Sequence, residues 1–306
     1  MCGIVGLFLK DARLQPELGA LLSEMLITMT DRGPDSAGIA LYGQSGAGKG
    51  KLTVQSDAPE AFDGLDTALS QALDLPVTME VRSTHAVLSL SHDRLDAARQ
   101  ALAGLRPALR LMSRGTTLEI YKEVGLPRSV VSRFGIDKMS GTHGIGHTRM
   151  ATESAVTTAG AHPFNTGEDQ CLVHNGSLSN HNALRRKLRR AGVEVLTEND
   201  TEVGAAYLTW RMQQGASLGQ ALESGLTDLD GFFTFVVGTR DGFGVVRDPI
   251  ACKPAVMAET DQYVAFGSEY RALADLPGVE TARVWEPEPA TVYFWTHPQP
   301  PQAQAA

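Results

Sequence analysis

The order of apolar and polar positions predicts a mixture of strands and amphipathic helices. A continuous apolar run at 3–8 is typical of a buried strand, and leucines and methionines at helical spacing over 16–30 predict a helix packed on a sheet. Further helices are predicted at 58–72, 93–104, 180–191 and 201–214, with short ones around 118–134. Further strands are predicted at 37–42, 86–90, 144–150, 171–176, 232–247, 255–259, 263–268, 281–285 and 291–295. This order favours an α+β fold in which helices cover the faces of antiparallel sheets.

Capping residues set the expected starts of two helices. Ser179 is expected to cap the helix at 180–191, and Asp200 or Thr201 the helix at 201–214.

Glycine-rich stretches mark two expected turns. Residues 43–50 nearly match a phosphate-binding loop, but Gly50 stands where a Ser or Thr hydroxyl would hold magnesium, and a strand-like sequence follows. We therefore expect a hairpin loop there, and a second hairpin over 232–247 that turns at Asp241-Gly242. No internal repeat or linker divides the chain, and the proline-rich end at 297–306 is expected to be a disordered tail.

Composition and charge restrict the class of protein. The chain has 306 residues, of which 42% are apolar and 20% charged, as in a soluble globular protein. Its 35 acidic and 27 basic residues give a net charge of −8, which argues against nucleic acid or an anionic membrane as a partner. No apolar stretch approaches the ~20 residues of a membrane span, and the first residues lack a signal-peptide pattern. We expect a cytoplasmic protein.

One of the three cysteines has a chemical reason to be a cysteine. Cys171 and Cys252 are expected to be structural, and the three are too few and too scattered for a disulfide framework or a metal knuckle. Removal of Met1 would leave Cys2 with a thiol and a free α-amine on one residue. The thiolate is the reactive form of cysteine, and the α-amine can accept the thiol proton, as it does for N-terminal threonine nucleophiles. The sequence therefore predicts a nucleophile with its own base at Cys2.

Several polar residues stand where predicted elements end. Arg149 carries a bidentate donor suited to a carboxylate, although a surface ion pair would use it equally well. Asn175 and Gly176 end a strand, where an amide side chain and an unshielded backbone N–H can form an oxyanion hole; a plain Asn-Gly turn is the alternative. Asp200 either caps its helix or faces a ligand ammonium group, and His162 either lines a pocket or is a structural histidine.

A metal site is not expected. His143 and His147 are four residues apart, but Gly144 and Gly146 between them favour a strand over a helix, and no carboxylate stands at ligand spacing.

Taken together, these residues fit one substrate class. A thiol at Cys2, an oxyanion hole at Asn175 and Gly176, and charges at Arg149 and Asp200 suit an α-amino acid with an electrophilic side-chain carbonyl. Glutamine fits, because attack by the thiol would release ammonia and leave a thioester, which hydrolyses to glutamate.

At this point the sequence resembles the class II glutamine amidotransferases, which are N-terminal-nucleophile hydrolases. The similar segments appear in family order over roughly 1–42 and 140–295: 2–6, 32–38, 147–149 with 151–152, 162–164, 174–176, 199–202, 247–249 with 253–254, and 267–269. The resemblance implies a four-layer α/β/β/α sandwich of two antiparallel sheets.

The resemblance also implies a role for each site residue. Cys2 would be the nucleophile and, through its amine, the base, and Asn175 with Gly176 would form the oxyanion hole. The substrate-binding residues would be Arg149 and Thr152 at the glutamine carboxylate and Asp200 at its amino group, together with His162 and Arg32. Two departures affect the pocket: Met150 stands where many members have tryptophan, and Glu153 where some have histidine.

The chain is most similar to the free-standing amidotransferase subunits related to glutamate synthase, particularly the N-methylglutamate synthase type. We expect a single amidotransferase domain at 1–296 with an insertion at about 57–140, a segment much longer than in simple members. The sandwich would use nearly the whole length, leaving no room for a ~250-residue barrel that consumes ammonia. The acceptor site is therefore expected on a glutamate-synthase-like partner in a hetero-oligomer. We expect no cofactor in this chain, with any FMN or iron–sulfur cluster on partner subunits, and we expect 57–140 to dock the partner and gate the ammonia path.

Two alternatives stay open at this stage. A regulatory or scaffolding subunit with the same fold would result if Met1 were retained, because an acylated nitrogen on Cys2 is no longer a base. An amidase for another amide is the second, although Arg149 and Asp200 argue against it because they suit a free amino acid.

Overall fold

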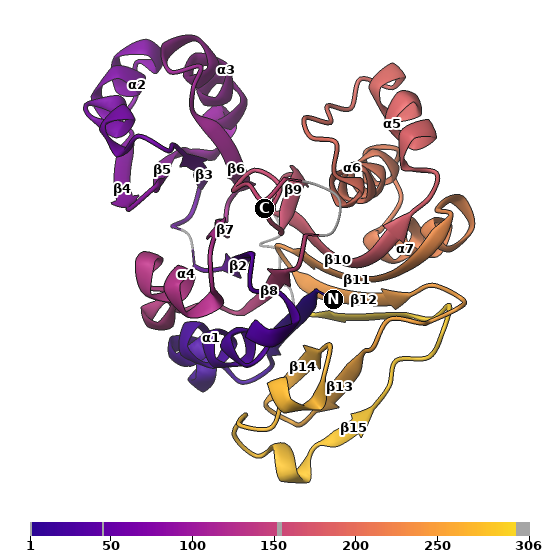
Figure 1. Ribbon diagram of the computed structural model, residues 1–306. Coiled ribbons are helices and arrows are strands. Elements are labelled where there is room, and N and C mark those ends of the chain that lie inside the picture. Colours follow the sequence, from indigo (N-terminus) through magenta and orange to yellow (C-terminus); the bar gives the residue numbers. More distant parts are fainter. Residues whose placement is uncertain (1, 45, 152–154, 298–306) are drawn as a thin grey trace, which may run out of the picture.

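A computed structural model describes residues 2–44, 46–151 and 155–297 of the chain (Figure 1). Its first sheet has seven antiparallel strands in the order β15-β13-β14-β1-β8-β2-β7. Their bounds are β1 Gly3–Leu9, β2 Ser36–Tyr42, β7 Leu118–Val124, β8 His143–Arg149, β13 Val256–Glu259, β14 Tyr263–Gly267 and β15 Arg283–Trp285. Helices α1 (Leu18–Thr28) and α4 (Pro127–Phe134) cover the outer face of this sheet.

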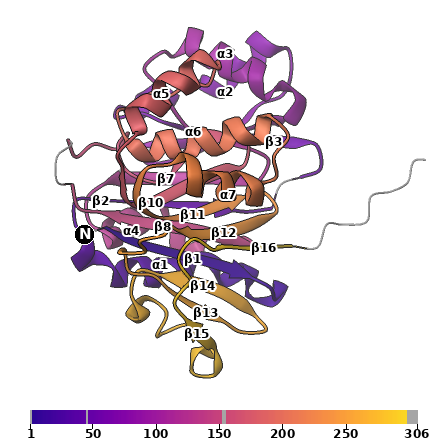
Figure 2. The same ribbon diagram turned by 90° about the vertical axis from the view of Figure 1, so that its right-hand side faces the viewer.

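The second sheet has five antiparallel strands in the order β16-β12-β11-β10-β9. Their bounds are β9 Phe164–Gly167, β10 Gln170–Leu178, β11 Gly231–Thr239, β12 Gly242–Arg247 and β16 Val292–Thr296. Helices α5 (His181–Arg190), α6 (Asp200–Gln213) and α7 (Leu218–Asp228) cover its outer face, so that Figure 2 shows two sheets stacked between two helical layers. The predicted four-layer α/β/β/α sandwich is confirmed.

Strand β1 lies between two hydrophobic cores. Its side chains alternate, with Ile4 and Phe8 in the core between the two sheets and Val5, Leu7 and Leu9 in the core under α1. A strand that is buried on both faces is apolar at every position. This double burial explains the continuous apolar run from which the strand was predicted.

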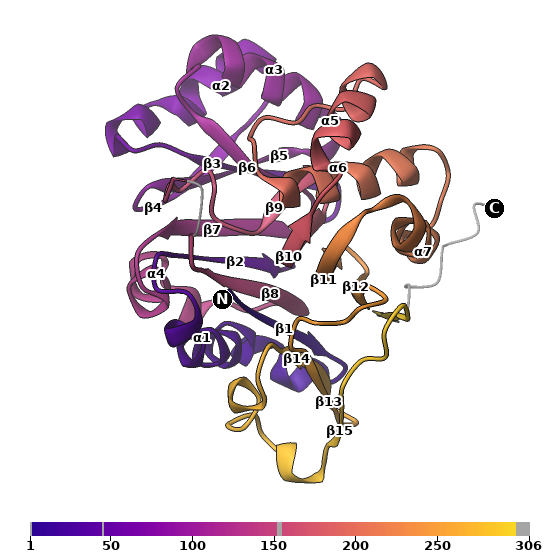
Figure 3. The same cartoon turned by 45° about the vertical axis from the view of Figure 1, so that its right-hand side comes forward.

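A third sheet stands apart from the sandwich at one edge (Figure 3). Its order is β4-β5-β3-β6, with bounds β3 Lys49–Gln55, β4 Thr78–Arg82, β5 His85–Ser91 and β6 Arg110–Gly115. Helices α2 (Leu65–Leu73) and α3 (Leu95–Leu105) pack on it around a separate core. The prediction of a hairpin loop at 43–50 is wrong, because β2 and β3, which this stretch joins, belong to different sheets.

The structure divides the range 57–140 between two parts of the molecule. Helices α2 and α3 and strands β4 to β6 belong to the third sheet, whereas β7 and α4 belong to the seven-stranded sheet. The prediction of short helices around 118–134 is confirmed for 127–134, which is α4, and wrong for 118–124, which is strand β7. Whether this range is an insertion in the family stays a prediction.

Two predicted helix caps lie one residue away from the observed ones. Asn180 precedes α5 in place of Ser179, and the Asn199 side chain caps α6 by accepting a hydrogen bond from Thr201 N at 2.9 Å. Helix α7, which the sequence analysis missed, begins with a capping box at Ser217.

Short 3₁₀ turns connect many of these elements. They span Ala12–Glu17, Thr30–Arg32, Pro59–Phe62, His92–Arg94, Ile136–Lys138, Tyr270–Ala272 and Val279–Thr281. The tail predicted at 297–306 lies outside the described residues, apart from His297. Among the described residues, no helix has the length and apolar content needed to span a membrane.

The contact between the two sheets generates a prediction at Gly6. A Cβ atom there would lie 2.5 Å from the ring of Phe243 on the facing sheet. Gly6→Ala is expected to lower the free energy of unfolding by about 1–3 kcal/mol, because overpacking forces the ring or the strand to move. Gly104→Ala is the matched control: it lies in α3 with nothing within 4 Å, and is expected to stabilise by about 0.4–1 kcal/mol. Urea denaturation measures both, and equal stability of the two variants would contradict the prediction.

Candidate functional site

Cys2 lies at the start of the central strand of the first sheet, held by contacts from four other segments. The pairing of β1 with β8 places Gly3 opposite Thr148, so that Cys2 lies at the strand end beside Arg149. Its carbonyl oxygen accepts hydrogen bonds from Arg32 Nε at 3.0 Å and Asn175 Nδ2 at 3.1 Å. The next residues are fixed too, because Gly3 N donates to Thr148 Oγ1 and Ile4 N to Ser268 Oγ. The half-buried thiol is therefore attached to a rigid strand end.

Strand β10 of the facing sheet carries the two residues that are predicted to form an oxyanion hole. Asn175 and Gly176 lie near its end, and the Asn175 amide already reaches the Cys2 backbone. Gly176 has a φ of 148°, and a Cβ atom there would lie 2.0 Å from Phe232 O. Only glycine fits this combination of conformation and close approach.

A cavity of about 780 Å³ opens at this strand end, within the ~300–1,000 Å³ common for small-molecule sites. Six of the residues predicted from the sequence line it: Cys2, Arg149, His162, Asn175, Gly176 and Asp200. Their positions come from β1, β8, β10, α6 and the segment before β9. The fold thus brings together residues that are up to 198 positions apart.

Arg149 and Asp200 supply the opposite charges of the cavity. Arg149 is 7% exposed and its Nη1 donates to Ala155 O at 3.3 Å. One oxygen of Asp200 accepts a hydrogen bond from Leu178 N at 2.9 Å, and its side chain is 24% exposed. Asn199 performs the capping role that the sequence analysis considered for Asp200, and the carboxylate of Asp200 lines the cavity instead.

Three buried histidines, His147, His162 and His174, lie behind these charges. The rings of His147 and His162 stack with centroids 4.0 Å apart, and Thr201 Oγ1 lies 3.2 Å from His162 Nε2 and 3.1 Å from His174 Nδ1. Burial lowers the pKa of His147 to about 3 and also lowers the pKa of His162 and of His174. All three imidazoles are therefore neutral at neutral pH. His162, for which the sequence left two alternatives, is a buried residue that also lines the cavity.

Arg32, a predicted binding residue, is not part of this cavity lining. Arg32 lies behind Cys2, where Nε binds the Cys2 carbonyl and Nη1 pairs with Glu269 Oε1 at 2.5 Å. Its role in binding substrate stays a prediction, and its observed contacts hold the backbone of Cys2. Thr152 lies outside the described residues.

Other lining residues were missed by the sequence analysis. Lys253 lines the cavity with its Nζ 5.0 Å from the centroid of the Phe232 ring, which also lines it. Arg247 holds this region by donating to Lys253 O at 2.8 Å. The signal was the Arg-Asp-Pro and Lys-Pro segment at 247–254, which was noted but given no role.

Metal binding finds no support within the described part of the chain. No group of three or more His, Cys, Asp or Glu side chains is placed there so that it could hold a metal ion.

The buried histidines generate a prediction about acid stability. The pKa of His147 is lowered to about 3 in the folded protein. Between this pKa and the ordinary value of ~6.5, the imidazole is therefore protonated in the unfolded chain but not in the folded protein. Stability must therefore fall as the pH drops through this window, by up to about 1.4 kcal/mol per pH unit for this group. His147→Gln keeps a donor for His174 O and is expected to reduce the slope by that amount. Urea denaturation between pH 4.5 and 6.5 measures it, and equal slopes in wild type and variant would refute the assignment.

Comparisons with known proteins agree with this geometry. A family model described as "Glutamine amidotransferase domain" matches residues 147–275. The chain is 68% identical over 298 residues to the glutamine amidotransferase-like protein GlxB of Rhizobium meliloti, covering 97% of this chain and 99% of that one. It is 33% identical over 180 residues to the amidophosphoribosyltransferase of Synechocystis, covering 56% and 36% of the two chains.

A solved structure supports the fold. The glutamine phosphoribosylpyrophosphate amidotransferase from B. subtilis superposes with a TM-score of 0.62 at 19% identity, over 96% of this chain and 47% of that one. This chain therefore spans about half of that enzyme. With its two antiparallel sheets between helical layers, the protein has the N-terminal-nucleophile hydrolase fold and belongs to the class II glutamine amidotransferase family.

Proposed function

We propose that the protein is a glutaminase subunit that hydrolyses L-glutamine to glutamate and supplies the ammonia to a glutamate-synthase-like partner of the N-methylglutamate synthase type. The observation that carries this proposal is the single cavity that joins the Cys2 thiol, the Asn175 amide and the opposite charges of Arg149 and Asp200. Those groups suit a free amino acid with a side-chain amide.

In the proposed reaction Cys2 acts as the N-terminal residue. Its α-amine takes the thiol proton, and the sulfur attacks the carboxamide carbon of glutamine. Negative charge then develops on the carboxamide oxygen, next to the Asn175 amide and the Gly176 N–H. The C–N bond breaks as the ammonium group returns the proton to the leaving nitrogen, which departs as ammonia. Water, deprotonated by the same amine, hydrolyses the thioester and releases glutamate and the thiol.

The charges in the cavity define which end of the substrate they hold. The guanidinium of Arg149 can bind the α-carboxylate of glutamine through two hydrogen bonds, and Asp200 can bind its ammonium group. We propose that Thr152 assists at the carboxylate. His162 is neutral, so it gives the cavity a polar surface without adding a charge that would compete with Arg149 for the substrate carboxylate. This arrangement disfavours amides that lack a free amino acid head.

The ammonia acceptor is proposed to lie on a partner subunit in the cytoplasm. The described residues build the sandwich and the third sheet, and the GlxB relative is named as a glutamine amidotransferase-like protein. We propose that any flavin or iron–sulfur cluster of the complete reaction belongs to that partner, and that the third sheet takes part in docking it.

Replacement of the nucleophile is the direct test. Cys2→Ala is expected to lower glutaminase turnover by several orders of magnitude, because the thiol forms the covalent intermediate. A glutamine-mimicking thiol alkylator should add one label, at Cys2, as located by mass spectrometry of protein whose N-terminus has been determined by intact mass. Cys252→Ala, which removes an exposed cysteine, is the matched control and should leave activity and labelling unchanged. Comparable turnover in Cys2→Ala would end the nucleophile assignment.

The carboxylate role of Arg149 predicts an effect on binding. Arg149→Ala should raise the KM for glutamine by about 10–100-fold with a smaller change in kcat, because one or two charge-assisted hydrogen bonds are lost. Arg149→Lys keeps the charge but lacks the planar guanidinium, so its KM for glutamine should lie between that of wild type and that of Arg149→Ala. Steady-state glutaminase kinetics measure these values, and a KM in Arg149→Ala equal to that of wild type would contradict the role.

A further inference from the structure

The segment 155–163 forms one wall of the glutamine cavity. Five of its residues line the cavity: Ala155, Thr157, Ala159, Gly160 and His162. Within the segment, Ala161 N donates to Thr157 O, and Gly160 N to Thr157 Oγ1. These local bonds give the segment a defined shape, but its position relative to Cys2 depends on what holds it from outside.

Lys122 of strand β7 holds this wall from behind. Its side chain is buried, and Nζ donates to the carbonyl oxygens of Ala159, Ala161 and Pro163 at 3.4, 2.7 and 3.1 Å. An ammonium group carries three donors and no acceptor, which matches a ring of carbonyl oxygens. The same Nζ lies 4.4 Å from the centroid of the Phe164 ring.

Burial makes these contacts necessary for Lys122. Removal of the ammonium group from water lowers the pKa of Lys122 to about 7, against the opposing effect of Glu202. A buried cation is tolerated where hydrogen bonds replace its water. The carbonyl oxygens and the lysine therefore stabilise each other in one geometry. Gly38 on β2 permits this approach, because a Cβ atom there would lie 2.0 Å from His162 O.

Glu123, the next residue of β7, joins the wall to the third sheet. One carboxylate oxygen accepts a hydrogen bond from Thr158 Oγ1 in the wall, and the other accepts one from Thr84 Oγ1 at 3.0 Å. Thr84 lies in the turn between β4 and β5. Arg133 of α4 adds an ion pair to the same carboxylate at 3.5 Å. The carboxylate is therefore a direct bridge between the two parts of the molecule.

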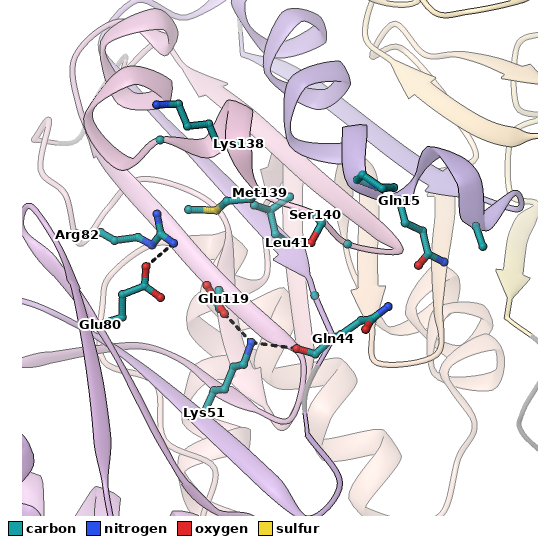
Figure 4. A pocket seen from close by; sticks show the side chains of 15 residues that line it. Gln15, Leu41, Gln44, Lys51, Glu80, Arg82, Glu119, Lys138, Met139 and Ser140 are labelled. Carbon is teal, nitrogen blue, oxygen red and sulfur yellow. Dashed lines mark hydrogen bonds and ion pairs between the residues drawn. The ribbon is translucent and has the colours of Figure 1, made fainter.

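A second link between β7 and the third sheet crosses a separate cavity of about 720 Å³ (Figure 4). There Lys51 of β3 pairs with Glu119 of β7 at 2.6 Å, and Glu80 pairs with Arg82 at 2.5 Å. Strand β7 thus contacts the third sheet at both Glu119 and Glu123.

We infer that Lys122 and Glu123 are positioning residues for the glutamine cavity, and that the Thr84–Glu123–Thr158 bridge couples the third sheet to the cavity wall. This inference rests on the proposed glutaminase function. A partner that displaces the turn between β4 and β5 would act on glutamine affinity without touching Cys2.

The test of Lys122 separates binding from chemistry. Lys122→Met keeps the aliphatic stem but removes the donors, and is expected to raise the KM for glutamine about tenfold or more with kcat within about twofold of wild type. Lys51→Met is the matched control, because it removes another lysine that contacts β7 but does not touch the wall. It should leave KM unchanged. Iodoacetamide, which needs no glutamine pocket, should alkylate Cys2 at the wild-type rate in both variants.

The bridge is tested by variants that remove single hydroxyl groups. Thr158→Val and Thr84→Val are each expected to raise KM by about two- to fivefold, with kcat unchanged, because each removes one hydrogen bond to a carboxylate. Hydrogen exchange at the amides of Gly160 and Ala161 should be faster in Lys122→Met and Thr158→Val than in wild type. The Thr84 result decides the coupling, since this residue is remote from the cavity lining.

Each outcome decides the inference. A folded Lys122→Met protein with wild-type KM would overturn the positioning role, and wild-type KM in Thr84→Val would overturn the coupling. If Lys122→Met does not fold, Thr158→Val decides, with a raised KM in support and an unchanged KM against. If wild type itself shows no glutaminase activity, the proposed function fails. The attachment of the wall is then decided by hydrogen exchange alone: faster exchange supports it and unchanged exchange overturns it.

Discussion

The pairing of β1 with β8 is the constraint on which the rest of the site depends. This register places the first residues of the chain in the middle of a seven-stranded sheet, with a hydrophobic core on each face. An N-terminus is ordinarily the most mobile part of a chain. Here Cys2 is held by its strand neighbours, by Arg32 and by Asn175, so that the thiol keeps a fixed position relative to groups on the facing sheet.

Many of the polar residues in this region position the site and do not line it. Ser268 and Thr148 bind the backbone after Cys2, and Arg247 binds the carbonyl of Lys253. Asp35 accepts a hydrogen bond from Ala151 N at 2.8 Å, next to Arg149. A site made from strand ends needs such contacts, because each strand fixes its own residues but not the loops beyond them.

The third sheet adds a unit with its own core to the four-layer sandwich. It meets the sandwich at β7, the edge strand of the first sheet, and at β9 of the second sheet, where Arg114 N donates to Asn165 Oδ1 at 3.2 Å. Polar contacts at Glu119 and Glu123 are part of this junction, as are Val87 and Met112 of the third sheet, which pack into the cores of the sandwich. Glu123 also reaches the cavity wall. An edge strand has unpaired backbone groups that a protein must cover or occupy, and here its side chains connect the sandwich with the third sheet.

The sequence by itself determined the parts of this protein that are local. Apolar runs predicted the buried strands, and helical spacing predicted α1, α3 and α6. Cys2 at the second position predicted a nucleophile whose own α-amine is free once Met1 is removed. All of these predictions depend on neighbours along the chain. The residue types at strand ends, at the start of one helix, before a proline and at the second position of the chain also predicted six residues that line the cavity. Periodicity did not reveal β7, because its alternation is short and includes Lys122, a buried lysine.

Only the tertiary structure decided which partners these residues meet. Arg32 contacts Cys2 and Glu269 across 30 and 237 positions, and Lys122 contacts carbonyl oxygens about 40 positions away. Such contacts follow from strand register and from the packing of separate sheets, which no local pattern encodes. For the same reason the sequence considered Asp200 as a cap, whereas the fold assigns the cap to Asn199 and brings the carboxylate of Asp200 to the cavity that contains Cys2.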